Sequence, residues 1–438
     1  MSDTTPSALP QAAVEITPAY RRYALFVLLL AYISSYVDRQ IMGVLLEPIR
    51  NEFLLTDTQM GFLGGIAFGI FYATLGIPIA FLADRWSRRN IISIAVTAWS
   101  FMTVACAFVV GFWSLAFARV GVGVGEAGSS PPSHSMIADL YPAEQRSGAL
   151  AIYALGVYIG IMVGFLVGAY VAHDYGWRMA FIVVGAPGLL IALLVRFTLK
   201  EPPRGHSDGK IAAPVGPIDW ASAKTQVAAG FRHLWGDKVS RHVVIGVTLV
   251  SFVGYGGAYW GAAFFIRSHG MSLIEVGQYL AAVIGGAGVI GAITGGRLAD
   301  SLGAKDARWT LWIVAAAKFI AAPIIVFFFL EVDTSVALII YIPTVLLGAF
   351  YLGPSFAMIQ TRAPVHMRAL SSAIMLFILN IIGLGLGPQA VGVLSDALAP
   401  AYGQESLRYA LLLLSFISIW GGFHYYLAGK HLVSANAR

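Results

Sequence analysis

Long apolar runs dominate this chain and alternate with short polar segments. Most runs hold about 20 or more predominantly apolar residues, enough for a helix to cross ~30 Å of hydrocarbon at ~1.5 Å per residue. The pattern predicts an all-α membrane protein with twelve transmembrane helices, at residues 22–47, 58–83, 90–110, 112–138, 147–172, 178–199, 242–267, 273–299, 309–330, 335–360, 369–394 and 406–428.

One polar stretch, residues 200–241, interrupts this pattern and is rich in proline and charge. It divides the chain into an N-terminal tail, a six-helix half, a linker, a second six-helix half and a C-terminal tail, at residues 1–20, 21–199, 200–241, 242–429 and 430–438. Within the linker, four apolar residues share one helical face: Trp220, Val227, Phe231 and Leu234. That face fits a helix lying along the membrane surface, and a solvated linker helix fits equally well.

The two halves repeat each other. The tetrapeptide at 81–84, Phe-Leu-Ala-Asp, corresponds to Arg-Leu-Ala-Asp at 297–300, a separation of 216 residues. A Pro and an Arg four residues apart precede both the fifth and the eleventh predicted helix, at a separation of 222 residues. Similar offsets at two places indicate a duplicated six-helix unit, an arrangement that places substrate sites between the halves near the middle of the membrane.

The charge content supports a membrane protein and sets its orientation. Only 11% of the residues are charged, against about 25% in soluble domains. Of the 28 Lys and Arg residues, 20 fall in the segments on the side of the two termini, 4 in the opposite segments and the rest within helices. Because positively charged loops stay in the cytoplasm, we expect both termini there. This distribution explains the net charge of +6 without a nucleic-acid partner.

Cofactor and metal chemistry find no support in the sequence. Cys106 is the only cysteine, and no Cys/His cluster has metal-ligand spacing. The glycine-rich run at 121–125 follows no strand and is followed by no phosphate-binding lysine, so it is not a nucleotide loop. We therefore expect no cofactor, no metal and no catalytic residues, and we expect a monomer that is energised by an ion gradient.

Four charged residues lie inside the predicted helices of the first half: Asp38, Arg39, Arg119 and Glu126. Charges in hydrocarbon cost roughly 2.5–3.5 kcal/mol each on insertion scales and usually mark function. Asp38 and Arg119 lie at one depth and are expected to pair if their helices are neighbours, with Glu126 two turns deeper than Arg119. Arg39 is rotated by about 100° from Asp38 and is free to face elsewhere.

We expect Asp38 and Glu126 to take up and release protons, with Arg119 and Arg39 tuning them, because a nearby cation and desolvation act oppositely on a carboxyl group. Arg39, Arg119 and Glu126 are also candidates for binding a substrate headgroup, since guanidinium groups bind anions through paired hydrogen bonds. A static clamp between helices is the alternative.

The second half is much less charged and offers Lys318 as its one clear cation inside a predicted helix. Tyr259, Tyr351 and Asn380 are its candidate substrate contacts, so an amphipathic solute could place its headgroup on the first half and its tail on the second. A row of glycines spaced by four on the fifth helix, Gly156 to Gly168, suggests close packing. We expect that row to line a seam with the eighth helix.

Asp84, Arg85 and Arg88 form a charged cluster after the second helix, and Asp300 holds the corresponding place in the second half. An aspartate at a helix end can bind the N-terminus of a neighbouring helix. We expect these four residues to form a gate at the cytoplasmic side, while anchoring to the inner membrane surface is the simpler role for part of the cluster.

The sequence resembles the Major Facilitator Superfamily in these places. The loop signature G-x-L-x-D-R-x-G-R-R appears with both glycines replaced, as Ala80-Phe81-Leu82-Ala83-Asp84-Arg85-Trp86-Ser87-Arg88-Arg89. The pattern R-x-x-x-G-x-G of the fourth helix appears as Arg119, Gly123 and Gly125. Two further segments are similar to the Spinster branch, namely 36–39 (Tyr-Val-Asp-Arg) and 121–127 (Gly-Val-Gly-Val-Gly-Glu-Ala), the latter followed by Ile137 to Pro142.

The resemblance implies a secondary transporter of a lysolipid or sphingoid phosphate, driven by protons and working by alternating access in a multi-pass membrane protein. The short loops favour a bacterial inner membrane. An exporter of drugs or small organic anions is the alternative within transport. A membrane-embedded lipid enzyme or receptor is the alternative of another class, but it would need a nucleophile, metal cluster or signalling domain that the sequence lacks.

Overall fold

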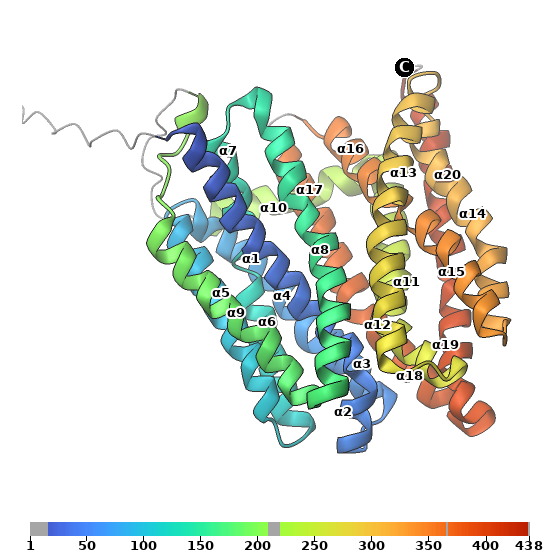
Figure 1. Cartoon of the computed structure of the whole chain (residues 1–438). Coiled ribbons are helices and arrows are strands. Elements are labelled where there is room, and N and C mark those ends of the chain that lie inside the picture. The colour runs from blue at the N-terminus through green and yellow to red at the C-terminus, as the bar shows by residue number, and fades with distance from the viewer. Residues whose placement is uncertain (1–15, 209–219, 365–366, 437–438) are drawn as a thin grey trace, which may run out of the picture.

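The computed structural model describes residues 16–208, 220–364 and 367–436, and within these it contains helices and no strands (Figure 1). The N-terminal tail up to residue 15, the middle of the predicted linker (209–219) and the last two residues of the C-terminal tail lie outside the described residues.

The first half runs from α1 to α9. Its helices are α1 Pro18–Val44, α2 Leu46–Phe53, α3 Asp57–Gly64, α4 Ile66–Ala83, α5 Arg88–Ala105, α6 Phe112–Glu126, α7 Ser130–Leu140, α8 Ala143–Tyr175 and α9 Trp177–Thr198. The helix α10 Trp220–Gly236 lies in the segment predicted as the linker.

The second half runs from α11 to α20. Its elements are α11 Lys238–His269, α12 Leu273–Ala282, η3 Val283–Ala287, α13 Gly288–Gly303, α14 Trp309–Leu330, α15 Thr334–Gly348, η4 Ala349–Tyr351, α16 Leu352–Arg362, α17 Arg368–Leu379, η6 Asn380–Leu386, α18 Gly387–Tyr402, α19 Ser406–Ser415 and α20 Ile417–Asn436.

Twelve membrane crossings follow from these elements. Ten segments of the described chain are long and apolar enough to span a bilayer. One of them, Arg368–Leu432, covers 65 residues and turns back at Gly403–Glu405, so it contains two crossings. The remaining crossing is α6 with α7, which a turn at 127–129 breaks into two helices. The predicted all-α class is confirmed, and helix breaks explain why some crossings fail a simple length test.

The two halves lie side by side, with the first in blue to green and the second in yellow to red (Figure 1). The helices that meet across the boundary are α3 with α18, α8 with α12, α4 with η6, and α1 with α11. Most of these contacts lie toward the end of the molecule that carries Asp57 and His269, which we call the closed end. The opposite end carries Pro18 and Asn436, and we call it the termini end.

The backbones of α3 and α4 approach the second half closely at Gly61 and Gly69. A Cβ added at Gly61 would lie 2.7 Å from the Pro388 carbonyl oxygen, and one added at Gly69 would lie 2.8 Å from Gly385. Side chains have no room at these positions, so the absence of a Cβ is what lets the two halves touch. The π-helix η6, which contains Gly385, adapts the second half to this contact.

This contact gives a first prediction. Gly69→Ala forces overlap with Gly385 and should destabilise the folded protein by about 1–3 kcal/mol, the usual cost of overpacking, seen as a lower Tm in detergent. Gly76→Ala in the same helix is the matched control, because a Cβ there meets nothing within 4 Å. Equal Tm values for the two variants would contradict a tight contact at Gly69.

The prediction that the glycine row of the fifth helix lines a seam with the eighth helix is wrong. Gly156, Gly160, Gly164 and Gly168 face α1, where an added Cβ would meet Tyr32, Tyr36, Gln40 and Ile41. The fifth and eighth helices do touch, but through Gly277 against Ala169 and Gly285 against Met162. Spacing alone identified a packed glycine face and could not tell which neighbour it packs against.

The helix α10 packs against the second half. Leu234 is fully buried, and a Cβ at Gly230 would lie 2.6 Å from Ile374 of α17. Phe231 lies against the same cluster. Phe231 and Leu234 of the predicted apolar face therefore pack on the second half, where α10 contacts α11 and α17, so this part of the helix is not freely solvated. The side chain of Trp220 lies outside the described residues.

Candidate functional site

Two helices of the first half, α1 and α6, bring charged side chains together inside the bundle. Arg39 Nε donates to Glu126 Oε2 at 2.6 Å, and Ser35 Oγ donates to the same oxygen at 2.8 Å. The Glu126 side chain is fully buried, whereas 12% of the Arg39 side chain is exposed. Glu126 is the last residue of α6, so the break before α7 follows directly after this ion pair.

Asp38, one residue before Arg39, is fully buried, and neither of its carboxylate oxygens has a hydrogen-bond partner among the described residues. Trp99 and Thr103 lie nearby on α5, outside hydrogen-bond geometry. An isolated buried carboxylate is costly when ionised. The site therefore pairs one carboxylate tightly and leaves the other without a direct partner.

Arg119 is buried on α6 but does not form the ion pair with Asp38 that the sequence predicted. Its Nε lies 3.4 Å from the Leu63 carbonyl oxygen, and its guanidinium lies 5.1 Å from the centre of the Phe68 ring. The pair predicted at one depth is replaced by Arg39–Glu126. Depth estimated from the sequence did not identify the partner, because side-chain direction also decides which groups meet.

Aromatic rings surround the Arg39 guanidinium. Its central carbon lies 4.3 Å from the centre of the Tyr72 ring, 4.9 Å from Tyr36 and 5.3 Å from Phe68. Rings at this distance attract a cation. Tyr255 of α11 packs against the same cluster from the second half. Arg39 is thus a partly accessible cation in an aromatic setting at the boundary of the two halves.

The candidate substrate contacts of the second half do not all lie together. Tyr351, in η4, accepts a hydrogen bond from Ser251 Oγ at 3.2 Å and is half-buried. Asn380 begins η6 and is also half-buried. Tyr259 lies nearer the closed end, where its hydroxyl donates to the Met60 carbonyl oxygen at 2.8 Å across the boundary between the halves. Tyr259 thus takes part in the contact between the halves in this structure.

Lys318 is buried in α14 and has carbonyl partners only. Its Nζ donates to the Gly348 carbonyl oxygen at 2.9 Å and lies 5.3 Å from the centre of the Tyr351 ring. This contact holds the lysine against the break between α15 and η4.

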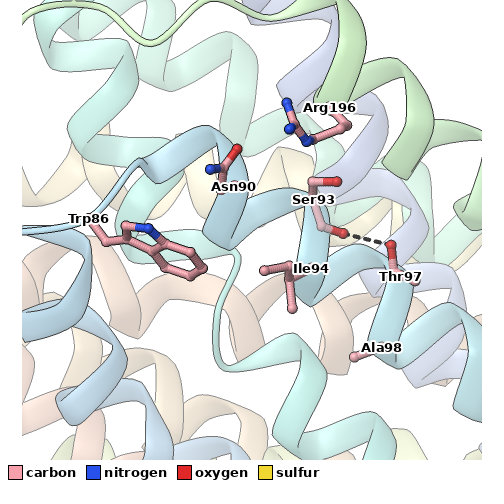
Figure 2. Close-up of a pocket in the computed structure, with 7 residues that line it drawn as sticks. All are labelled: Trp86, Asn90, Ser93, Ile94, Thr97, Ala98 and Arg196. Carbon is pink, nitrogen blue, oxygen red and sulfur yellow. Dashed lines mark hydrogen bonds between the residues drawn. The ribbon is translucent and has the colours of Figure 1, made fainter.

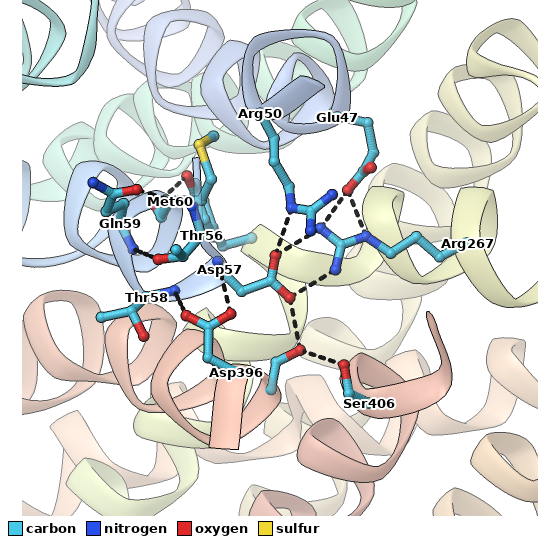
Figure 3. Close-up of polar contacts among 12 residues, drawn as sticks. Glu47, Arg50, Thr56, Asp57, Thr58, Gln59, Met60, Arg267, Asp396 and Ser406 are labelled. Carbon is cyan, nitrogen blue, oxygen red and sulfur yellow. Dashed lines mark hydrogen bonds and ion pairs between the residues drawn. The ribbon is translucent and has the colours of Figure 1, made fainter. Parts of the chain in front are cut away.

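A charged network joins the halves at the closed end (Figure 3). Arg267 of α11 donates through both terminal nitrogens to the two carboxylate oxygens of Asp57, at 2.7 and 2.8 Å, and through Nε to Glu47 at 2.7 Å. Arg50 approaches Asp57 at 3.0 Å from the first half. Two carboxylates of the first half therefore share one arginine of the second.

Asp396 of α18 completes this network from the second half. Its carboxylate accepts hydrogen bonds from the backbone N–H groups of Asp57 at 3.1 Å and Thr58 at 2.7 Å (Figure 3). These N–H groups start α3 and have no partner inside the helix. A carboxylate at a helix N-terminus is favoured by the helix dipole, so Asp396 binds α3 to the second half.

This network was not predicted from the sequence, although two signals for it were present. Thr56 and Gln59 form a capping box that marks the start of α3. Arg267 is one of only four cations predicted for that side of the membrane. Arg267 and its partner Asp57 lie 210 residues apart in the sequence, and no local pattern reveals a contact over that separation.

The predicted gate residues lie at the termini end, and the described contacts of Arg88 stay on the side of the first half. Arg88 is fully buried and bonds to Asp139, Ser135, Glu201 and the Pro202 carbonyl oxygen, all of the first half or the segment just after α9. Arg85 donates to the Phe81 carbonyl oxygen. Asp84 and Asp300 are exposed, and neither forms an ion pair with a described residue. The described contacts of Arg88 therefore join α5, α7 and the segment after α9 at the termini end.

Glu201 outside the membrane-spanning helices gives a second prediction. Burial opposes its ionisation, but hydrogen bonds from the Arg89 backbone N–H, Arg88 and Ser87 together hold the pKa of Glu201 below its usual value. A lowered pKa stabilises the folded state above the unfolded value of about 4.3, and this contribution is lost as the pH falls through the folded-state pKa.

We expect Glu201→Gln to lower the stability by about 1–3 kcal/mol at pH 7. The difference from the unmodified chain should shrink below about pH 4.3. Thermal unfolding in detergent across this pH range measures both effects. Glu144→Gln is the control, because Glu144 is an exposed carboxylate of α8 at the same end. A pH-independent loss in Glu201→Gln would show that packing, and not the charge, is responsible.

No group of three or more His, Cys, Asp or Glu side chains in the described chain is arranged to hold a metal ion.

Three arrangements have chemical consequences. They are the buried carboxylate of Asp38 beside the Arg39–Glu126 ion pair, the partly accessible guanidinium of Arg39 among aromatic rings, and the network around Asp57 that joins the halves at the closed end.

Comparisons with known proteins agree with this architecture. The family model of the Major Facilitator Superfamily matches residues 28–388. An MFS-type efflux pump of Mycolicibacterium smegmatis is 35% identical over 426 residues, covering 96% of each chain. Protein spinster homolog 1 of Xenopus tropicalis is 27% identical, covering 92% of this chain and 80% of the relative.

A solved structure is similar over nearly the whole fold. It is the crystal structure of a bacterial homologue of the human lysosomal transporter Spinster, in an inward-facing and unoccupied conformation, with a TM-score of 0.84 and 29% identity, covering 95% of this chain and 98% of that chain. The chain is a multi-pass membrane transporter and not an enzyme, and it belongs to the Major Facilitator Superfamily as a transporter of the Spinster type.

Proposed function

We propose that this chain is a proton-coupled transporter of an amphipathic, lipid-like solute of the lysolipid or sphingoid-phosphate class, and that it works by alternating access. The observation that carries the proposal is Asp38, a fully buried carboxylate without a hydrogen-bond partner. Beside it lies the Arg39–Glu126 ion pair. Buried ionisable groups inside membrane helices usually serve ion or substrate movement.

Asp38 and Glu126 are the proton carriers in this proposal. A carboxyl group shielded from water favours its neutral form, whereas a nearby arginine or water favours the ionised form. When one end of the molecule opens, water reaches the carboxyl group and the balance changes. Arg39 can exchange partners between Glu126 and an anionic headgroup, which links proton release to substrate binding. Arg119 acts on Asp38 from a distance.

The substrate would lie between the halves with its two ends in different surroundings. Arg39 with its aromatic neighbours suits a phosphate-bearing headgroup, because guanidinium binds phosphate through paired hydrogen bonds. The second half supplies Tyr351 and Asn380 at the same boundary, with no carboxylate among its candidate residues. An apolar wall facing a cationic one suits an amphipathic solute.

The same proposal assigns the closed end to the outer side of the membrane. The network of Arg267, Asp57, Glu47 and Asp396 would keep the outer side shut while the termini end is open to the cytoplasm. The excess of Lys and Arg at the termini end supports this orientation. We propose a bacterial inner membrane, both termini in the cytoplasm, a monomer, and protons and the bilayer as the further partners.

An exporter of drugs or small organic anions is the second candidate, and the similarity to an efflux pump at 35% identity favours it. Purified protein in liposomes that contain a pH-sensitive dye separates the two. Movement of lysolipid or sphingoid phosphate accompanied by a pH change supports the first. Movement of small organic anions alone supports the second, and transport without a pH change rules out proton coupling.

A further inference from the structure

A groove in the first half is lined by residues of α5, α9 and the loop before α5 (Figure 2). The helices α5 and α9 lie at the edge of the molecule away from the second half (Figure 1). The groove has a volume of about 480 Å³. All of its lining residues belong to the first half, so it is separate from the transport site proposed above.

The groove is polar at one end only. Arg196, Trp86 and Asn90 line it close to the termini end, because Arg196 lies in the last turn of α9 and Trp86 just before α5. Arg204 donates to the Trp86 carbonyl oxygen at 3.1 Å and to the Ala83 carbonyl oxygen at 2.6 Å, which fixes the loop that carries the indole. Tryptophan and arginine at such a depth are typical of the membrane–water interface.

The rest of the groove is apolar. The hydroxyl groups of Ser93 and Thr97 donate to the backbone carbonyl oxygens of Ala192 and Ser93, so neither has its hydrogen free for a ligand (Figure 2 draws the second bond). Ile94 and Ala98 continue the lining along α5. Residue 98 lies about 12–15 Å along α5 from the polar end, which corresponds to the depth of acyl chains.

Charge decides which headgroup fits. Arg196 is exposed and forms no ion pair with a described residue, and its guanidinium lies 5.9 Å from the Phe197 ring centre. No carboxylate lines the groove. The nearby carboxylate of Glu201 is already bonded by Arg88, Ser87 and the Arg89 backbone. The polar end therefore presents a net positive charge at the membrane interface.

We propose that this groove binds one anionic phospholipid of the leaflet at the termini end. Its phosphate contacts Arg196 and the amide of Asn90, Trp86 lies at the level of the glycerol backbone, and an acyl chain lies along Ile94 and Ala98. The lipid is a resident of the bilayer and not a transported solute, and it steadies the contact between α5 and α9. Basic pockets between membrane helices bind anionic headgroups by this chemistry.

The test uses the whole protein in detergent, titrated with phosphatidylglycerol or phosphatidylcholine and followed by native mass spectrometry. The unmodified chain should bind phosphatidylglycerol more tightly than phosphatidylcholine. Arg196→Gln should weaken phosphatidylglycerol binding about fivefold, which corresponds to about 1 kcal/mol per arginine at an anionic surface. Arg297→Gln is the matched control, because Arg297 is an exposed arginine of α13 that lies near the termini end, in the second half.

A second variant tests the apolar part. Ala98→Phe fills the groove and should weaken the binding of both lipids while keeping the preference for phosphatidylglycerol. The proposal is overturned if Arg196→Gln binds like the unmodified chain, if Arg297→Gln loses as much affinity, if the two lipids bind equally to the unmodified chain, or if Ala98→Phe binds both lipids as before.

Discussion

Asp38→Asn is expected to abolish transport driven by a pH gradient and to leave exchange of substrate across the membrane intact. Asparagine has nearly the shape of aspartate but cannot carry a proton on and off. In the proposed mechanism, exchange needs only binding and the movement of the two halves, whereas uphill transport also needs the proton. Liposomes loaded with substrate, assayed with and without a pH gradient, measure the two activities separately.

Stability provides an independent check on Asp38. Neither oxygen of this buried carboxylate has a hydrogen-bond partner, so its replacement by a neutral amide should leave the Tm unchanged or raise it. Glu126→Gln should behave differently, because it removes the partner of Arg39 and leaves a buried cation without its ion pair. We expect Glu126→Gln to lose gradient-driven transport and also to lower the Tm.

These paired outcomes distinguish proton coupling from a static clamp. If Asp38 only held helices together, Asp38→Asn would lower the Tm and affect exchange and gradient-driven transport equally. If Asp38→Asn retained full gradient-driven transport, the proton site would have to lie elsewhere, and Lys318, a buried cation inside a helix of the second half, would be the next residue to replace.

The fold could be predicted from the sequence because hydrocarbon thickness sets the length of each apolar run. All twelve crossings appear where the runs predicted them, with ends that differ by several residues. The runs carry no information about helix breaks. The turn after Glu126 and the π-helix at Asn380–Leu386 arise from local packing and glycine content, and both lie beside candidate site residues.

Which residues belong to the site was easier to predict than which of them form ion pairs. Asp38, Arg39, Arg119 and Glu126 could be selected because charge is rare inside apolar helices. Which carboxylate pairs with which arginine depends on side-chain direction and on how α1 and α6 pack, so the predicted Asp38–Arg119 pair is replaced by Arg39–Glu126. The network around Asp57 joins residues that are distant in the sequence, and helical periodicity cannot reveal such contacts.

The ion pairs at the two ends of the molecule differ in a way that bears on transport. At the closed end, Arg267 and Asp396 of the second half bind Asp57, Glu47 and the start of α3 in the first half. At the termini end, the described ion pairs of Arg88 and Arg362 stay within one half. Among the described residues, the ion pairs that join the halves therefore lie at the closed end. In the proposed alternating access, these ion pairs must break when the closed end opens.

Arg267→Met should therefore shift the protein toward the other conformation, in which the end that is closed in this structure has opened. The arginine is nearly buried and binds two carboxylates of the opposite half, so its loss removes the ion pairs that hold this end shut. Breaking a buried pair costs about 3–5 kcal/mol. If only half of this free energy is lost, and from one conformation only, the ratio of the two conformations still changes by more than about tenfold.

Distances between spin labels measure this shift. Leu54 and Val332 are exposed, at 87% and 78%, in loops of the two halves at the closed end, and Ala143 and Ser301 are exposed at the termini end. Cysteines at the first pair should move apart in Arg267→Met, and cysteines at the second pair should approach. Cys106 is buried and should stay unlabelled.

Arg178→Met is the matched control for this experiment. Arg178 also forms an ion pair at the closed end, with Glu52 at 2.6 Å, but both residues belong to the first half. Its loss should leave both label distances unchanged. If Arg267→Met also leaves them unchanged, or if the control shifts them as much, the ion pairs of Arg267 do not hold the closed end shut. The remaining contacts between the halves, those of Asp396, Tyr259, Gly61 and Gly69, would then have to do so.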